Sequence, residues 1–158
     1  MQMMKMDESE FKKFYERSLL EFAKQHAEDT GTAVDEWVIK AKEAIGKHFP
    51  DGINTKDHYV YHLKNKMHEP VGYLWFGIRD EQNQKKVFIY DILVEESFRG
   101  KGYSKIILTW LESETKRLGI NEISLHVLGY NYTARALYDS FGFEITNLFM
   151  SKKVNVNN

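Results

Sequence analysis

The sequence predicts one α/β domain of the α+β kind over residues 1–158, with a mixed, partly antiparallel sheet flanked by helices. Three observations lead to this class. Apolar residues recur at helical spacing in the first third, alternate with a period of two in the middle, and switch between both patterns afterwards. No repeat, low-complexity stretch or Gly/Ser linker divides the chain, whose 158 residues are enough to bury one core.

Two helices are expected at the N-terminus. Asp7 and Glu10 have the spacing of a capping box at the start of the first helix, which should end at Gly31. Thr32 is expected to cap the second helix, which should stop by Pro50. The mostly apolar stripes consist of Phe11, Phe14, Tyr15, Ser18, Leu19, Phe22 and His26 in the first helix and of Val34, Trp37, Val38, Ala41, Ala44, Ile45 and His48 in the second.

Three strands are expected next, over 57–64, 71–78 and 87–94, with a polar turn over 79–86. Apart from Asp91, the third strand is apolar or aromatic throughout, as expected for a strand that is covered on both faces. The elements expected after it are a helix over 103–118 closed by Gly119, a strand over 122–128, a helix over 133–141, and one or two strands within 143–154.

The composition excludes several classes of function. With 22 basic and 23 acidic residues, the chain offers no excess positive charge to a nucleic acid. It has no cysteine, which removes a thiol nucleophile, a thiolate-bound zinc ion and a disulfide. Its apolar runs are far shorter than the ~20 residues of a membrane span, and residues 1–7 lack a signal pattern, so a cytoplasmic protein is expected. His58 and His62 would lie roughly 13 Å apart on a strand, too far to share a metal ion.

A loop with two glycines, Arg99–Ser104, lies between a predicted buried strand and an amphipathic helix. The glycines permit a tight turn, and the first N–H groups of the helix, with its positive dipole end, attract an anion. An ordinary strand-to-helix turn with solvated basic side chains is an equally good interpretation of this loop alone. The candidate anion-binding residues are Arg99, Gly100, Lys101, Gly102, Tyr103 and Ser104.

A second segment, 131–143, predicts by itself only a capped helix with an apolar face, in which Tyr138 is a packed ring. Together, however, the two segments resemble the GNAT superfamily of acyl-CoA-dependent N-acyltransferases. Arg99, Gly102 and Ser104 are similar to the family pattern Arg/Gln-x-x-Gly-x-Gly/Ala, with Ser104 in place of the last small residue. The residues that match the family's second motif are Asn131, Ala134, Leu137, Tyr138, Gly142 and Phe143.

The resemblance, which covers about residues 71–154, implies a mostly antiparallel sheet and acetyl-CoA as cosubstrate, with no metal. It implies that the pyrophosphate lies against Arg99–Ser104 and that the pantetheine arm runs along the strand that ends in Ile92, Leu93 and Val94. Tyr138 would protonate the departing thiolate and contact the cosubstrate, and Asn131 would bond the cosubstrate or order the site.

The base that takes the proton of the amine has two candidates. Asp91 is the lone charge in a strand predicted to be buried, although a structural carboxylate held by hydrogen bonds is an equal alternative. His126 lies within a predicted strand, and the segment around it is similar to one in some protein N-terminal acetyltransferases, where a histidine is the base. A packed histidine is the alternative there. The sequence slightly favours His126.

Taken together, the sequence predicts a cytoplasmic N-acetyltransferase that moves the acetyl group from acetyl-CoA directly to a primary amine. Because cysteine is absent, no cysteinyl acyl-enzyme can form. The acceptor is left open between a protein N-terminus or lysine and a small amine, and a homodimer is left open too. The alternative function is a non-catalytic acyl-CoA-binding sensor or scaffold with the same fold, but a pure binder would not need the acid Tyr138. No nucleic acid or membrane partner is expected.

Overall fold

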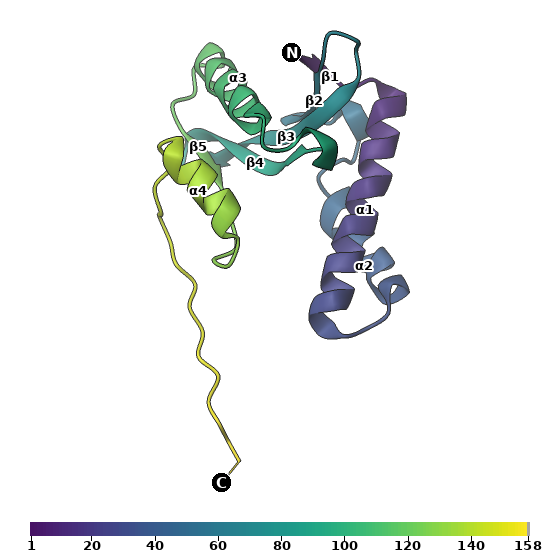
Figure 1. Cartoon of the computed structure of the whole chain (residues 1–158), viewed down its shortest axis with the longest axis vertical. Coiled ribbons are helices and arrows are strands. Elements are labelled where there is room, and N and C mark those ends of the chain that lie inside the picture. Colours follow the sequence, from purple (N-terminus) through teal and green to yellow (C-terminus); the bar gives the residue numbers. More distant parts are fainter. Residues whose placement is uncertain (158) are drawn as a thin grey trace. The chain divides into compact units, whose positions relative to one another are not determined.

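A mixed sheet flanked by helices organises the computed structural model, which describes residues 1–157, and this arrangement confirms the predicted fold class (Figure 1). The elements, in chain order, are β1 (Gln2–Lys5), α1 (Glu8–Thr30), α2 (Val34–Gly46), β2 (His58–Lys64), β3 (Pro70–Glu81), β4 (Gln84–Val94), α3 (Tyr103–Arg117), β5 (Ile123–Leu125) and α4 (Tyr132–Ser140). The strands lie in the order β1-β2-β3-β4-β5. All neighbours are antiparallel except β4 and β5, which are parallel.

Aromatic side chains attach α1 and α2 to one face of the sheet. The Phe14 ring on α1 lies 5.3 Å from the Tyr73 ring and 6.0 Å from the Trp75 ring, both on β3. Phe49, just after α2, lies 4.8 Å from Trp75. Aromatic pairs of this kind contribute about 0.5–1.5 kcal/mol each beyond the area that they bury, so this cluster fixes where both helices lie on the sheet.

The helix α3 covers the opposite face of the sheet, as Figure 1 shows. Its Trp110 ring lies 4.6 Å from Tyr61 on β2 and 6.2 Å from Phe76 on β3. Ile107, Leu108 and Leu111 of α3 are fully buried. Since both faces of β3 are covered, every residue from Val71 to Gly77 is buried. The sequence predicts that β4 is the most buried strand, but β3 has that place, because only three residues of β5 pair with β4.

The strands β3 and β4 form a longer hairpin than the sequence predicts. The expected polar turn over 79–86 is mostly strand, and only Gln82 and Asn83 make the turn, with φ values of 55° and 64°. Two central residues with positive φ are typical of the tight turn that matches the twist of a hairpin. The turn prediction was wrong in length because polar side chains also occupy strand ends that face solvent.

A β-bulge interrupts the pairing of β3 with β4. Trp75 pairs with Asp91 and Phe76 pairs with Ile89, so Tyr90 is an extra residue on β4. An extra residue reverses the alternation of side chains beyond it. Tyr90 and Asp91 therefore face the same side of the sheet, the side covered by α1 and α2.

Several local expectations were borne out. The capping box of Asp7 and Glu10 is present, with the Asp7 carboxylate accepting the Glu10 N–H at 2.8 Å. The first helix ends at Gly31, as predicted. The strands β2 and β3, the long helix α3 and the short helix α4 lie close to their predicted ranges.

Other expectations were wrong. Ala33, not Thr32, precedes α2, and it makes no side-chain cap. The strand β1 was not predicted, and β5 covers three residues instead of the expected 122–128. No strand lies within residues 143–157, where one or two were expected. The apolar residues there pair with no strand of the sheet, and Phe149 and Val156 are exposed.

Contacts divide the chain into two compact units, the first ending at His126 and the second beginning at Val127. The first contains the sheet, α1, α2 and α3, and the second contains α4. The expectation of a single domain stays a prediction. Within residues 1–157, no helix is both long and apolar enough to cross a membrane.

Candidate functional site

A cavity of about 320 Å³ lies between the first two helices and the bulged part of the sheet. Helices α1 and α2 form one wall, and β3 and β4 form the other. It is lined by Ser18, Glu21, Phe22, Ala44, Ile45, His48, Tyr73, Trp75, Tyr90 and Asp91. The bulge creates the polar part of this lining, because it turns Asp91 toward α1 instead of toward α3.

Asp91 is held by hydrogen bonds in this cavity. The Tyr73 hydroxyl donates to Asp91 Oδ2 at 2.7 Å, and the Ile92 N–H also bonds the carboxylate. Burial raises the pKa of Asp91, and these two bonds with the charge of Arg17 oppose that rise. Burial and the neighbouring Asp91 charge raise the pKa of Tyr73, so its hydroxyl stays protonated and remains a donor.

Stacked rings form the opposite part of the lining. The Trp75 and Tyr90 rings lie 4.6 Å apart and nearly parallel, at 15°. The Tyr90 hydroxyl accepts a hydrogen bond from Arg79 Nε at 3.1 Å, and Trp75 Nε1 donates to His58 Nδ1 at 3.2 Å. These bonds fix the two rings that face the cavity, so its shape is set before any ligand binds.

His48, at the end of α2, also lines the cavity, with its ring 4.8 Å from Tyr90. Burial, with the charges of His58, Lys47 and Arg79, lowers the pKa of His48 from 6.5 to about 4. The imidazole is therefore neutral at neutral pH and can accept a hydrogen bond. The sequence placed His48 only in an apolar stripe and gave no sign of this environment.

Beyond the bulge, toward its C-terminal end, β4 has one edge that pairs with no other strand. Its pairing with β5 ends at Ile89 with Leu125, whereas β4 continues to Val94. The Glu95 N–H bonds to the Val71 carbonyl on β3 at 3.0 Å, so by alternation the N–H and C=O of Val94 point toward the open edge. This is the segment, Ile92–Val94, that the resemblance assigns to pantetheine.

The predicted anion-binding loop, Arg99–Ser104, lies shortly after the end of β4. Arg99 Nε donates to the Val94 carbonyl at 3.0 Å, so this side chain ties the loop to the strand end. Gly102 precedes α3 with φ 79°, a conformation that favours glycine, and no side chain caps the helix. Arg99, Gly100, Lys101 and Gly102 are exposed, and Tyr103 and Ser104 are half-buried. The first N–H groups of α3 are thus available to an anion.

His126 does not lie where the sequence predicts. It is the first residue beyond β5, is exposed, and does not line the cavity that contains Asp91. The expectation that it sits mid-strand was wrong, because β5 ends after the three residues that pair with β4. Asp91 and His126 do follow the last paired residues of the two parallel strands, as expected.

The second motif lies in the C-terminal unit. Asn131 is the N-cap of α4, and its side-chain oxygen accepts the Ala134 N–H at 3.2 Å. Tyr138 is half-buried, with its ring 5.5 Å from the Phe143 ring. The motif therefore forms the capped helix that its residues predict.

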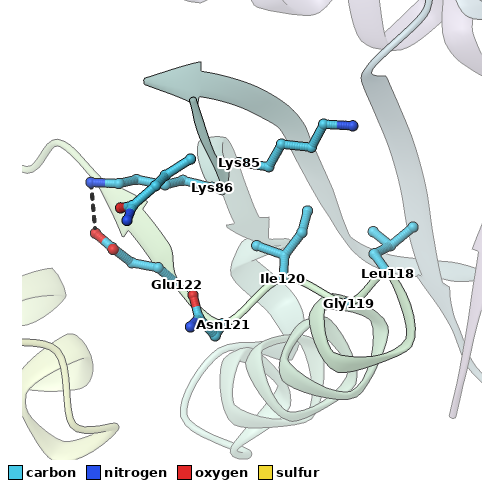
Figure 2. Close-up of a pocket in the computed structure, with 8 residues that line it drawn as sticks. Lys85, Lys86, Leu118, Gly119, Ile120, Asn121 and Glu122 are labelled. Carbon is cyan, nitrogen blue, oxygen red and sulfur yellow. Dashed lines mark ion pairs between the residues drawn. The ribbon is translucent and has the colours of Figure 1, made fainter. Parts of the chain in front are cut away.

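A second cavity, of about 410 Å³, lies at the start of β4, at the opposite end of the strand from the Arg99–Ser104 loop (Figure 2). Lys86 Nζ lies 3.0 Å from Glu122 Oε1 and 3.5 Å from Glu81 Oε2. Lys86 is thus paired with two carboxylates, and none of the predicted site residues lines this second cavity.

The comparison with protein families identifies the chain. A model described as the Acetyltransferase (GNAT) family matches residues 11–143. The chain belongs to this family. The predicted resemblance and the predicted N-acetyltransferase activity are thereby confirmed. The GNAT family implies acetyl-CoA as cosubstrate and an acetyl acceptor, which is unknown here.

Two relatives of this GNAT chain come from Bacillus subtilis (strain 168). The uncharacterized N-acetyltransferase YycN is 35% identical over 143 residues, which cover 87% of this chain and 92% of YycN. The uncharacterized N-acetyltransferase YdgE is 34% identical over 149 residues, covering 94% and 95%. The crystal structure of YycN matches with a TM-score of 0.84 at 33% identity, over 98% of this chain and 99% of YycN.

The lowered pKa of His48 predicts a loss of stability in acid. Between about pH 6.5, where an unfolded histidine takes up a proton, and about pH 4, the folded chain resists that proton. Stability should therefore fall as the pH drops through this window. His48→Gln should flatten the dependence of the melting temperature on pH there, leaving the part due to His58 and His62, whose pKa values are also lowered by burial.

Melting curves of the wild type, His48→Gln and His126→Gln at a series of pH values check this. His126→Gln, which changes an exposed histidine, is the control. An unchanged slope in His48→Gln would mean that the His48 ring takes up its proton as easily in the folded chain as in the unfolded one.

Proposed function

We propose that this GNAT protein transfers the acetyl group of acetyl-CoA directly to a primary amine bound in the cavity lined by Asp91. One observation carries the proposal: at the bulge, a single strand presents a carboxylate to a cavity and, beyond it, an open backbone edge to which the cosubstrate could bind. The absence of cysteine supports direct attack over a cysteinyl relay.

The open edge of β4 and the loop after it supply the groups for the cosubstrate. Backbone groups of Ile92–Val94 would bond the pantetheine arm as an added strand, and an N–H of this edge would bond the thioester oxygen as it gains negative charge. The N–H groups at the start of α3, with Lys101 nearby, would hold the pyrophosphate. Arg99 would act by keeping the loop attached to Val94.

We propose Asp91 as the base, in place of His126. An ammonium must lose a proton before its nitrogen can attack, and a base must lie within reach of that proton. Asp91 lines the cavity and has a pKa raised by burial, which makes its carboxylate a better proton acceptor than an ordinary one. Tyr73 would keep it oriented.

Tyr138 is the proposed acid and Asn131 the proposed cosubstrate or ordering residue, on the strength of the family motif. As the C–N bond forms and the C–S bond breaks, the Tyr138 hydroxyl would protonate the thiolate. A thiolate is already a fair leaving group, so the help expected from this acid is at the low end of the usual range.

The proposed function is tested by offering acetyl-CoA and a mixed pool of amines and measuring free CoA together with the mass of the products. Wild type should release CoA and form an N-acetylated amine. Tyr138→Phe should still be stabilised by acetyl-CoA against heat, yet turn over about 10²-fold more slowly. A protein that binds acetyl-CoA but acetylates no amine in the pool would be a binding module instead.

The pyrophosphate assignment predicts a separate effect. Acetyl-CoA and CoA should raise the melting temperature, because they bind only the folded chain. Gly102→Glu should abolish that rise, since its carboxylate would repel the anion. Gly102→Ala is the matched control, because it introduces the same backbone cost at φ 79° without charge. If Gly102→Glu keeps the full rise, the pyrophosphate binds elsewhere.

The choice of base is tested by pH–rate profiles with one saturating amine. Asp91→Asn retains an oxygen for the Tyr73 hydroxyl, so it should fold normally but lose the acid limb of kcat/KM and about 10²–10⁴-fold in rate. In the wild type this limb should lie above the ~3.9 of an ordinary aspartate, because burial raises the pKa of Asp91. His126→Gln should keep both. The reverse pattern would return the base to His126.

A further inference from the structure

The cavity contains a buried hydroxyl with no hydrogen-bond partner. Ser18, on α1, is only 8% exposed, and its Oγ atom bonds no other group among residues 1–157. Thr115, the other buried polar residue, donates to the Leu111 carbonyl one turn back at 2.7 Å. Ser18 makes no such bond. An unsatisfied buried hydroxyl costs about 1–3 kcal/mol. The Oγ atom is closed to solvent, so it can meet a ligand in the cavity only if the Ser18 side chain rotates, and no existing hydrogen bond opposes that rotation.

The charges of the cavity point to a cation. Glu21 lies three residues after Ser18 on α1, and its exposed side chain lines the cavity together with the more deeply placed Asp91. None of the lining residues is lysine or arginine. Two cations lie beside the lining. Arg17 is engaged by Glu95, with Nη1 and Oε1 2.5 Å apart, and Arg79 donates to the Tyr90 hydroxyl. The lining itself thus carries two carboxylates and no positive side chain.

Apart from the two carboxylates, the cavity is lined mainly by apolar and aromatic side chains, which suit an aliphatic chain. Phe22 and Ile45 line one side, and the rings of Tyr73, Trp75 and Tyr90 line the other. Aromatic faces attract ammonium groups and pack well against methylenes. A volume of about 320 Å³ is at the lower end for a small-molecule site, so a short chain fits the cavity well.

We infer that the acceptor is a short aliphatic diamine, with one amine beside Asp91 and Ser18 and the second, as an ammonium, at Glu21. The inference rests on the proposed function and names its substrate class. The Ser18 hydroxyl bonds the reacting amine and orients its lone pair. The reacting ammonium first gives one proton to Asp91. Its nitrogen then forms a bond to the acetyl carbon while the bond from that carbon to sulfur breaks, and the sulfur takes the proton of the Tyr138 hydroxyl, so that CoA leaves as a thiol. The second nitrogen proton returns to Tyr138, which leaves a neutral amide.

Glu21 makes the cavity selective. The second ammonium keeps its charge throughout the transfer, so its attraction to Glu21 lowers the KM for a diamine and gives no help to a monoamine. An amino acid brings a carboxylate that Glu21 and Asp91 repel. A diamine should therefore be preferred over both a monoamine and a diamino acid of similar length.

The first test compares putrescine, butylamine, ornithine and a peptide with a free N-terminus as acceptors. Putrescine should have the highest kcat/KM. Glu21→Gln should lower the ratio of kcat/KM for putrescine over butylamine by about three- to tenfold, mainly through KM. Glu16→Gln is the matched control, because Glu16 is exposed on α1 but does not line the cavity. Its ratio should equal that of the wild type.

The second test uses Ser18→Ala, which separates a ligand-binding hydroxyl from a structural one. Removing an unsatisfied buried hydroxyl should raise the melting temperature of the free protein by about 2–4 °C. The same variant should weaken putrescine binding, measured by calorimetry without acetyl-CoA, by about tenfold. A lower melting temperature with unchanged putrescine binding would make Ser18 a structural residue and overturn its assignment.

The outcomes distinguish this inference from the proposed function. If another amine is acetylated more efficiently than putrescine, or if Glu21→Gln leaves the ratio unchanged, the diamine inference is wrong while the transferase proposal stands. If putrescine binds by calorimetry and depends on Glu21, but no amine is acetylated, the cavity assignment stands and direct transfer is wrong.

Discussion

The extra residue in β4 is the constraint on which the candidate site depends. Side chains on a strand alternate strictly, so with regular pairing Tyr90 would lie opposite Trp75, Asp91 would lie opposite Leu74, and Asp91 would face α3. On that side it would meet the fully buried Ile107 and Leu111, where an unpaired carboxylate is very costly. The bulge turns the carboxylate to the α1 side, where the Tyr73 hydroxyl bonds it. A single inserted residue thereby permits a charged group in a strand that is otherwise apolar.

The same irregularity coincides with the end of pairing between β4 and β5. The last pair joins Ile89 and Leu125, immediately before the bulge, and beyond it β4 continues to Val94 paired with β3 alone. A bulge bends its strand and increases the local twist, which carries the rest of β4 away from its parallel neighbour. The cavity on one face and the open edge beside it therefore have one cause, and a change that removed the bulge would affect both.

Much of this arrangement could be predicted from the sequence, because it depends on local signals. The capping box at Asp7, the strand β2 with its alternating faces, and the glycine loop before α3 all follow from residue types at fixed spacing. The remaining features, among them the edge strands β1 and β5, depend on pairing with other strands, which local signals do not predict. The strand β1 is four residues long and exists only through its pairing with β2, and β5 ends where β4 departs from it. His126 was misplaced for that reason.

The bulge itself left no sequence signal. The run from Val87 to Val94 is compatible with regular alternation, and only the pairing with β3 reveals the additional residue. Ser18 and His48 were hidden in the same way, since both belong to helix faces that are otherwise apolar or aromatic. Periodicity identifies which face of a helix is covered, but it does not tell whether the covering surface is packed or hollow.

The distribution of destabilising groups supports the proposal that the cavity is the reaction site. A carboxylate whose pKa is raised by burial, an imidazole whose pKa is lowered to about 4, and a hydroxyl without a partner all line it. On the α3 side of the sheet, the buried Thr115 hydroxyl is bonded and the remaining buried side chains are apolar. The energetically unfavourable polar groups are therefore gathered around this one cavity, whereas the buried polar group on the other face of the sheet is hydrogen-bonded. Such a distribution is expected where a ligand completes the interactions that the protein alone leaves open.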